Sequence, residues 1–529
     1  MRSNDGGATW QTALVPAECS LTSVCFLTNQ IGVVAGSRFD SFQKQHVGVL
    51  LKTRDGGESW SVVAAPQQNL NFNAGTAVGV IDASSLPPIS FIQFFDLENA
   101  VAIAMPDVAN TGSQVLRTGD GGLTWQPLAD DQKTARWQSG AFFSANDGII
   151  VGLGDAAGSV VGDKVITLQQ PQRTLRRRRD ASLSRDGAGW MAGDGGLLLT
   201  TADGGVTWRQ PVGRLAPALN DVFDYRTVDH DGSNVCIAGS PGSVVLQSSD
   251  AGNSWKFRQL TSPAPISRIR FVGNSTVLAV GAFGVIHRSE DAGLTWSAVR
   301  NGNYRAAVLC LTTDADDASF RMLTNISGDQ GFRSVVVQPS ARLPRDGSDD
   351  AVAADRLRIA VPMAGANVFS QDWMFSRTQP MQHQVQAELL KSWGLQTDGR
   401  LTEILPQRLA QLIRIWRPDA ICIDRASEND EVANIWLQAL EPATAIAAGD
   451  NPRGAILDQV GLPKWSVSRT VVKLTGADAS PLKFSGGDLL TNLGTTSGLV
   501  AAHCESAAEW SDVIDSKSPA DQDSAVAYA

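Results

Sequence analysis

Cysteine and histidine are scarce in this chain of 529 residues, and their scarcity excludes several kinds of site. The six cysteines occur without a CxxC pair, so the sequence predicts free thiols rather than a zinc site or a disulfide framework. The five histidines lie far apart and form no HExxH motif. We therefore expect no metal and no cofactor.

Charged residues are also few, at 19%, and acidic ones outnumber basic ones to give a net charge of −10. Nucleic-acid-binding domains usually present a basic surface, so no nucleic-acid partner is expected. No apolar run reaches the roughly 18 residues that a membrane-spanning helix needs, and no charged-then-apolar leader opens the chain. The sequence thus predicts no membrane span. The location of the protein stays unknown, because a repeat motif begins only two residues after Met1 and an upstream start would leave an extracytoplasmic location open.

Glycine and tryptophan, by contrast, are abundant, with 50 and 14 copies, and they mark an octapeptide repeat. The pattern Ser/Thr-x-Asp-x-Gly-x-Ser/Thr-Trp occurs six times, which indicates a repeat architecture. Its Asp and Trp positions are Asp5 and Trp10, Asp55 and Trp60, Asp120 and Trp125, Asp203 and Trp208, Asp250 and Trp255, and Asp291 and Trp296.

Each octapeptide has the residues of a tight hairpin turn. The Asp carboxylate can accept hydrogen bonds from nearby backbone N–H groups, and the Gly supplies a positive φ. The hydroxyl groups satisfy further polar groups of the turn, and the Trp buries its ring against the sheet below. Because each turn offers one carboxylate where a calcium loop supplies several, we predict a structural role for these residues.

The spacing of the octapeptides predicts a β-propeller. The shortest interval, from Asp250 to Asp291, has the length of one four-stranded blade. The longest, from Asp120 to Asp203, spans two blades, with second strands expected at 148–152 and 189–193. The missing octapeptide of one of these blades would be replaced by a solvated loop around the run of arginines at 176–179.

The two ends of this repeat region complement each other. The first octapeptide has no strands before it, whereas residues 305–338 contain three strand-like segments and no octapeptide after them. We therefore expect residues 11–15 to add the outer strand of the last blade and to close the ring. The expected fold of residues 1–338 is an all-β, seven-bladed propeller.

The octapeptide is the Asp-box, or BNR repeat, which occurs in sialidases and in sortilin-type receptors. The boxes at Asp55, Asp120 and Asp203, combined with strands such as Trp190 to Gly193, most resemble the photosystem II stability and assembly factor family. This resemblance covers roughly residues 1–340. It implies a non-enzymatic scaffold that binds a protein partner, although a shared fold does not by itself establish a shared activity.

Two alternatives remain. A glycoside hydrolase of the sialidase type would need a Tyr nucleophile, and only Tyr225 and Tyr304 lie in or beside the propeller. The acidic residues around Tyr225 are expected to form a polar loop between strands. A carbohydrate-binding propeller would need exposed rings, for which Trp137 and Trp190 are the candidates, although core packing is the simpler role for both.

Basic residues concentrate between positions 256 and 305. Arg268 and Arg270 are two apart on one expected strand, so they share a face and could meet a carboxylate together. The candidate binding face consists of Arg258, Arg268, Arg270, Arg288, Arg300 and Arg305. The alternative is that these arginines only solubilise the surface.

The last third of the chain follows a different pattern. Residues 339–355 are rich in Pro, Gly, Ser and Asp and predict a linker. Residues 356–510 alternate strand-like and helical patterns, beginning with a buried strand at 357–361, and predict a small α/β domain of unknown role. Residues 511–529 are expected to be disordered.

Overall fold

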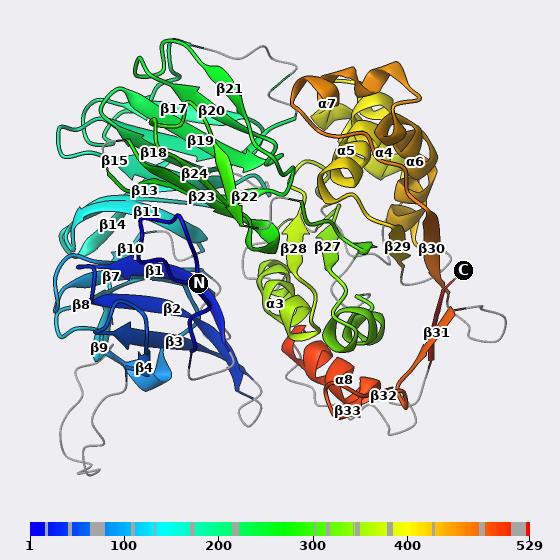
Figure 1. Cartoon of the computed structure of the whole chain (residues 1–529), viewed down its shortest axis with the longest axis horizontal. Coiled ribbons are helices and arrows are strands. Elements are labelled where there is room, and N and C mark those ends of the chain that lie inside the picture. The colour runs from blue at the N-terminus through cyan, green and yellow to red at the C-terminus, as the bar shows by residue number, and fades with distance from the viewer. Residues whose placement is uncertain are drawn as a thin grey trace.

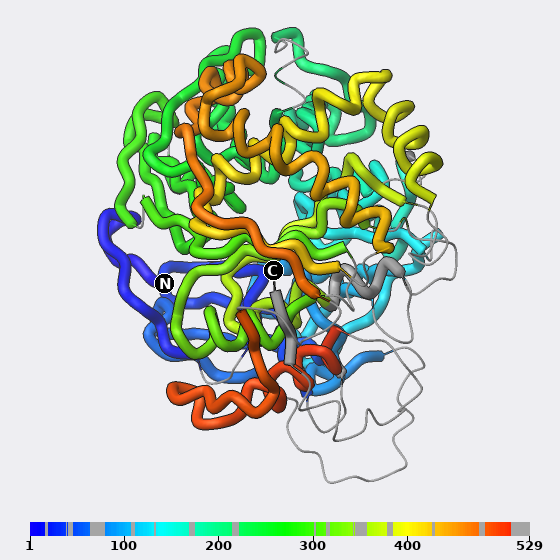
Figure 2. Tube along the Cα trace, turned by 90° about the vertical axis from the view of Figure 1, so that its right-hand side faces the viewer, coloured from blue at the N-terminus to red at the C-terminus, as the bar shows by residue number. Residues whose placement is uncertain are grey.

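The computed structural model describes residues 1–529 apart from 16–18, 41–44, 64–79, 107–111, 132–133, 170–174, 214–218, 220–221, 274, 301–302, 314–317, 342, 344–349, 378–384, 426–428, 475–481, 509–524 and 529. The described residues form a β-propeller and a C-terminal region of helices around a mixed sheet (Figure 1). The C-terminal region lies across one face of the propeller ring (Figure 2).

Six mainly antiparallel sheets form the blades, in sequence order. Blade 1 consists of β1 (Ser20–Phe26), β2 (Gly32–Asp40), β3 (Gln45–Thr53) and β4 (Ser61–Val62). Blade 2 consists of β6 (Ile89–Phe94), β7 (Ala100–Ala104), β8 (Gln114–Thr118) and β9 (Thr124–Pro127), with β5 (Ile81–Asp82) at its edge and a 3-10 turn, η1 (Ala83–Ser85), between β5 and β6. Blade 3 consists of β11 (Trp137–Ser144), β12 (Asp147–Gly152), β13 (Ala157–Val161) and β14 (Lys164–Gln169), with β10 (Ala129–Asp130) at its edge.

The other three blades repeat this order. Blade 4 consists of β15 (Arg178–Leu183), β16 (Gly189–Gly193) and β17 (Leu197–Thr201), and an isolated bridge from Thr200 to Arg209 stands where its outer strand would be. Blade 5 consists of β18 (Asp224–Asp231), β19 (Asn234–Ser240), β20 (Val244–Ser248) and β21 (Lys256–Gln259). Blade 6 consists of β22 (Ile266–Phe271), β23 (Val277–Gly281), β24 (Ile286–Ser289) and β25 (Ser297–Arg300), with η2 (Ala282–Gly284) between β23 and β24.

The second strands of the blades explain why these sheets stack. All five residues of β7 and of β16 are buried, because each second strand lies between two neighbouring blades and must be apolar on both faces. The second strands expected at 148–152 and 189–193 are confirmed as β12 and β16.

The Asp-box of blade 4 shows how these turns are held. Asp203 Oδ1 accepts hydrogen bonds from the Thr201 hydroxyl (2.6 Å) and from the Thr207 N–H (2.9 Å). The Trp208 Nε1–H donates to the carbonyl oxygen of Gly205 (2.9 Å), and the backbone of Gly205 has a φ of +93°. The ring of Trp125 in blade 2 is 1% exposed, and the other five box tryptophans are half-buried.

Blade 3 lacks a box, and the run of arginines does not replace it. Its third and fourth strands, β13 and β14, join through a plain turn at Gly162 and Asp163. Arg117 of blade 2 donates to Asn146, to the Gly162 carbonyl oxygen and to the Asp163 carboxylate. One cationic side chain thus ties this turn to the preceding blade.

The propeller has six blades, so the prediction of seven is wrong. The N-terminal box forms a short hairpin with a bridge between Arg2 and Gln11. It packs against blade 6, where Arg288 Nε donates to the Gly6 carbonyl oxygen (2.9 Å), and against blade 1, where Arg2 pairs with Glu58 (2.9 Å). This hairpin lies at the rim between the two blades. In the described part of the chain, β22 and β1 do not pack together as the inner strands of the other neighbouring blades do.

Residues 305–338 do not form a last blade, because their strands belong to the C-terminal region. β26 (Val308–Thr312) and β27 (Ser334–Gln338) pair in parallel with each other, and β26 pairs in parallel with β29 (Ala420–Asp424). All residues of β26 and β27 are buried, as expected for central parallel strands covered on both faces. The expected contribution of residues 11–15 to a blade with 305–338 is therefore also wrong.

The mixed sheet has the order β28-β27-β26-β29-β30-β34-β31. Its further strands are β28 (Val368–Gln371), β30 (Arg469–Leu474), β31 (Leu482–Ser485) and β34 (Ala525–Tyr528), and a separate hairpin joins β32 (Leu489–Leu490) to β33 (Thr495–Thr496). The longer helices are α3 (Asp350–Met363), α4 (Gln386–Gln396), α5 (Leu401–Trp416), α6 (Glu431–Ala448) and α8 (Ser497–Ala508). Short helical segments are α2 (Phe320–Leu323), η4 (Thr324–Asp329), η6 (Pro452–Gly454) and α7 (Ala455–Gln459).

Three expectations for this region change. The segment 357–361, expected as a buried strand, lies inside helix α3, which also takes up the end of the expected linker at 339–355. The sheet begins at Val308 rather than after residue 356. Of the expected disordered tail at 511–529, residues 511–524 and 529 lie outside the described residues, and β34 pairs with β30 and β31.

Candidate anion-binding pocket

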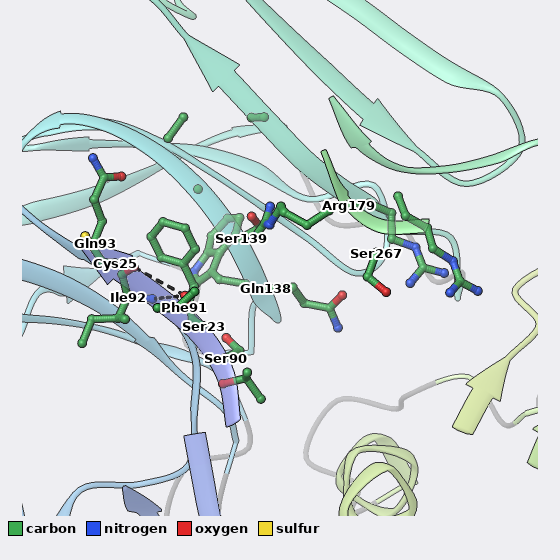
Figure 3. A pocket seen from close by; sticks show the side chains of 18 of the residues that line it. Ser23, Cys25, Ser90, Phe91, Ile92, Gln93, Gln138, Ser139, Arg179 and Ser267 are labelled. Atoms are coloured by element: carbon green, nitrogen blue, oxygen red, sulfur yellow. Dashed lines mark hydrogen bonds between the residues drawn. The ribbon is translucent and has the colours of Figure 1, made fainter. Parts of the chain in front are cut away.

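A cavity of about 830 Å³ occupies the axis of the propeller. The inner strands of all six blades line it, and their small polar side chains include Ser23, Ser90, Ser139 and Ser267 (Figure 3). Because alternate residues of a strand point to opposite sides, each inner strand contributes only a few side chains to this lining.

Arginines are the dominant charged residues of the lining. It contains Arg136, Arg179, Arg226, Arg268, Arg270 and Arg358, and Asp229 is the one carboxylate among the described residues that line it. Five of these arginines come from the propeller and Arg358 comes from helix α3 of the C-terminal region. We call this cavity the arginine pocket.

The two arginines of β22 converge on one buried carboxylate. Asp180 of β15 is fully buried and pairs with Arg268 (2.6 Å) and Arg270 (3.6 Å). The hydroxyls of Thr227 and Ser139 also donate to it, at 2.8 and 3.2 Å. Burial would raise the pKa of Asp180, but the two arginine charges outweigh it and leave the pKa below its usual value. Asp180 thereby joins blades 3, 4, 5 and 6 at the axis.

Arg179 and Arg226 form the second part of the positive lining. Arg179 Nε pairs with the buried Asp194 (2.6 Å), whereas the Nε of Arg226 is buried without a hydrogen-bond partner. Burial, followed by the positive charge of Arg179, lowers the pKa of Arg226 to about 10. Asp224 and Asp194 compensate the charge of Arg226 only in part, and an anion in the pocket would stabilise it.

The candidate face expected from the sequence is not one face. Arg268 and Arg270 meet in the arginine pocket. Arg258 bonds Gln247 within blade 5, Arg288 holds the N-terminal hairpin, and Arg300 donates to the Gly284 carbonyl oxygen (3.1 Å). Arg305 pairs with Asp419 of the C-terminal region and lies over the ring of Trp465. Only two of the six expected arginines therefore share a site.

The run of arginines at 176–179 carries the signal that sequence reasoning missed. Arg177 and Arg178 are 4% and 7% exposed, and Arg178 opens the inner strand β15, from which Arg179 lines the pocket. The expected solvated loop is wrong. The signal for a strand at 178–183 is that Asp180 to Leu183 continue directly from the arginines to the next turn.

Residues weighed for a sugar-binding or hydrolytic role are mostly structural. Trp137 and Trp190 are 1% and 4% exposed. Tyr225 is buried on β18 and stacks on Phe223, so the expected polar loop around it is a strand. Among the described residues that line the arginine pocket there is no tyrosine and no glutamate.

The described residues offer neither a metal-binding cluster nor a helix suited to cross a membrane. No group of three or more His, Cys, Asp and Glu side chains in that part of the chain is placed to hold a metal ion. None of the helices found there has both the length and the apolar character needed to cross a bilayer.

Part of the propeller is similar in sequence to known proteins. The family model described as photosynthesis system II assembly factor YCF48 matches residues 168–320. The photosystem II assembly lipoprotein Ycf48 of Synechococcus sp. (strain CC9902) is 27% identical over 121 residues, which are 22% of this chain and 35% of that protein. The photosystem II stability/assembly factor HCF136, chloroplastic, of Oryza sativa subsp. japonica is 31% identical over 115 residues, which are 21% of this chain and 27% of that protein.

The chain thus spans about a third of the length of the curated relatives it matches. Among solved structures, "YCF48 bound to D1 peptide" is similar at 20% identity with a TM-score of 0.38, covering 54% of this chain and 84% of that one. The expected resemblance of the propeller to photosystem II stability and assembly factors is confirmed by the sequence matches.

Proposed function

We propose that this chain, whose propeller is of the photosystem II assembly factor type, is a non-enzymatic scaffold that binds an acidic segment of a partner protein in the arginine pocket. The observation that carries the proposal is the convergence of six arginines on one axial cavity of a chain whose net charge is −10. The relatives named above are assembly factors, which supports a role in binding rather than in turnover.

The chemistry of the pocket favours carboxylates as ligands. Guanidinium groups donate paired, charge-assisted hydrogen bonds to carboxylates, and several serine hydroxyls beside them can donate further bonds. Four of the arginines, Arg179, Arg226, Arg268 and Arg270, face three carboxylates, Asp180, Asp194 and Asp229, so this part of the pocket keeps a positive charge for a ligand. A cavity of about 830 Å³ lies within the usual range for a ligand site.

The parallel strands β26 to β30 and the helices around them support treating the C-terminal region as an α/β domain. A glycoside hydrolase and a carbohydrate-binding propeller remain as alternatives with less support. Trp137 is at the pocket but only 1% exposed, and neither Trp190 nor any tyrosine or glutamate is among the described residues that line it.

The test uses fluorescein-labelled hexaglutamate as the probe and the full chain as the receptor. Arg226→Gln removes a pocket charge, and Arg258→Gln removes an equal charge from the outer strand of blade 5. We expect Arg226→Gln to weaken binding about tenfold, the equivalent of losing one charge-assisted hydrogen bond of about 1.5 kcal/mol. Arg258→Gln should change the affinity less than twofold.

Equal effects of the two substitutions would show general charge attraction and refute a pocket site. Capture of partners from the source cells with the wild-type chain and with the Arg226→Gln variant then identifies the partner. A partner that binds through the pocket is retained by the wild-type chain and lost from the variant.

A further inference from the structure

The mouth of the arginine pocket lies where the propeller meets the C-terminal region. Its lining includes the first residues of several inner strands, such as Ser90 and Ser267, and also Arg358 of helix α3. Figure 3 shows Ser90, Gln138 and Ser267 on the side of the pocket nearest the yellow-green segments of the C-terminal region. A ligand in the pocket therefore touches both parts of the molecule.

Two pocket arginines also belong to the joint between these parts. Arg179 and Arg226 line a second, small cavity together with Asp224 of the propeller and with Asp372 and Arg408 of the C-terminal region. The pocket and the joint thus share Arg179 and Arg226. A change of charge in the pocket therefore alters the electrostatic potential at the joint.

The joint itself is a buried ion cluster. Arg408 Nη2 lies 3.0 Å from Asp224 and 3.1 Å from Asp372. Trp373 Nε1 also donates to Asp224, at 2.8 Å. Burial opposes the charge of Asp224, yet Arg408 and the donors of Gly195 and Trp373 hold its pKa at about 2. Apolar contacts surround the cluster, among them Phe283 of blade 6 against Trp416 of α5.

We propose that the C-terminal region forms a second wall of the arginine pocket. An acidic segment bound there contacts Arg358 and thereby tightens the docking of this region on the propeller. This rests on the proposed function. A ligand that contacts both bodies binds the docked arrangement better than an opened one, and by linkage it must shift the molecule toward docking. It also offsets the repulsion that Arg179 and Arg358 exert on Arg226.

The first experiment measures hexaglutamate binding to the full chain and to variants of the C-terminal region. Arg358→Gln is expected to lower the affinity about fivefold to tenfold, and Arg358→Lys, which keeps the charge, to lower it less than threefold. Arg469→Gln removes an exposed charge on β30, outside the pocket, and should leave the affinity within twofold.

The second experiment reads the docking directly by hydrogen exchange. The Trp373 indole N–H donates to the Asp224 carboxylate (2.8 Å) across the joint between the two parts. Saturating hexaglutamate should slow exchange of this indole N–H severalfold in the wild-type chain and not in the Arg358→Gln variant. Unchanged exchange in the wild-type chain overturns the coupling.

The outcomes separate this inference from the proposed function. If Arg226→Gln weakens binding and Arg358→Gln does not, the pocket binds acidic ligands, but the proposal that the C-terminal region forms its second wall is refuted. If the wild-type chain does not bind hexaglutamate at all, both proposals fall. Loss of binding in Arg358→Gln with retention in Arg358→Lys supports a charge contact over a folding defect.

Discussion

The tryptophans of two Asp-boxes offer a matched test of how much ring burial stabilises the propeller. Trp125 in blade 2 and Trp208 in blade 4 make the same hydrogen bond, from Nε1 to a glycine carbonyl oxygen, at 3.0 and 2.9 Å. They differ in exposure, because the Trp125 residue is 1% exposed and packs in the core between blades 1 and 2, whereas Trp208 is half-buried. Truncating both to alanine isolates the contribution of burial.

A fully buried tryptophan removes about 150–250 Å² from water, which at about 25 cal/mol per Å² corresponds to about 4–6 kcal/mol. Measured truncations of large aromatic residues cost about 3–5 kcal/mol. We expect Trp125→Ala to lower the free energy of unfolding by about 4 kcal/mol. Trp208→Ala should lower it by about 3 kcal/mol, since part of this side chain is exposed and less burial is lost.

Urea unfolding at 25 °C, followed by circular dichroism, measures the two losses side by side. The shared hydrogen bond cancels in the comparison, so the difference of about 1 kcal/mol reports on burial alone. Losses that agree within about 0.5 kcal/mol would mean that the turn hydrogen bonds, rather than the rings, hold the boxes in place. That result would refute the role assigned to the tryptophans.

Three further predictions concern polar groups. Asp180→Asn should destabilise the chain by about 2 kcal/mol in urea melts, less than for a fully buried pair because Arg268 and Arg270 keep access to water, and a neutral effect would contradict its role at the axis. Arg117→Met should lower the free energy of unfolding by at most about 1 kcal/mol, since it breaks an ion pair at the rim. Cleavage of the Gly162 turn by a protease should become faster. Unchanged cleavage would show that the turn keeps its structure without Arg117. The box hydrogen bonds lower the pKa of Asp203 and Asp250 to about 2, so the stability that these carboxylates add is complete above their unfolded value of about 3.9 and is lost as the pH falls toward 2. An acid titration that unfolds the propeller entirely above pH 5 would contradict this assignment.

The local features of the propeller could be predicted from the sequence, because each depends only on a short stretch of neighbouring residues. The Asp-box needs an acceptor, a glycine and hydroxyls at fixed offsets, and the strands at β12 and β16 are short apolar runs between turn residues. Those signals do not depend on the rest of the chain. The resemblance to photosystem II stability and assembly factors rests on the same local residues.

The number of blades could not be predicted in this way, because it depends on which strands pair. Val308–Thr312 and Ser334–Gln338 have the short apolar character of propeller strands, and a fully buried parallel strand has the same composition. Their partner, Ala420–Asp424, lies more than eighty residues further on. Periodicity within a segment carries no information about such a distant partner, so the sequence alone predicts a seventh blade from two strands of a parallel sheet.

The arginine pocket escaped sequence reasoning for a different reason. The arginines of the candidate face are dense in the sequence, whereas the pocket draws one or two residues from each of several blades. Arg136, Arg179, Arg226 and Arg268 are separated by roughly one blade each and meet only because the ring brings successive inner strands to one axis. Since alternate residues of an inner strand face the axis, a more informative search in this fold compares the same inner-strand position across blades. Applied here, that search places Arg179, Arg226 and Arg268 at the second or third residue of β15, β18 and β22, and it finds the site that density along the chain does not.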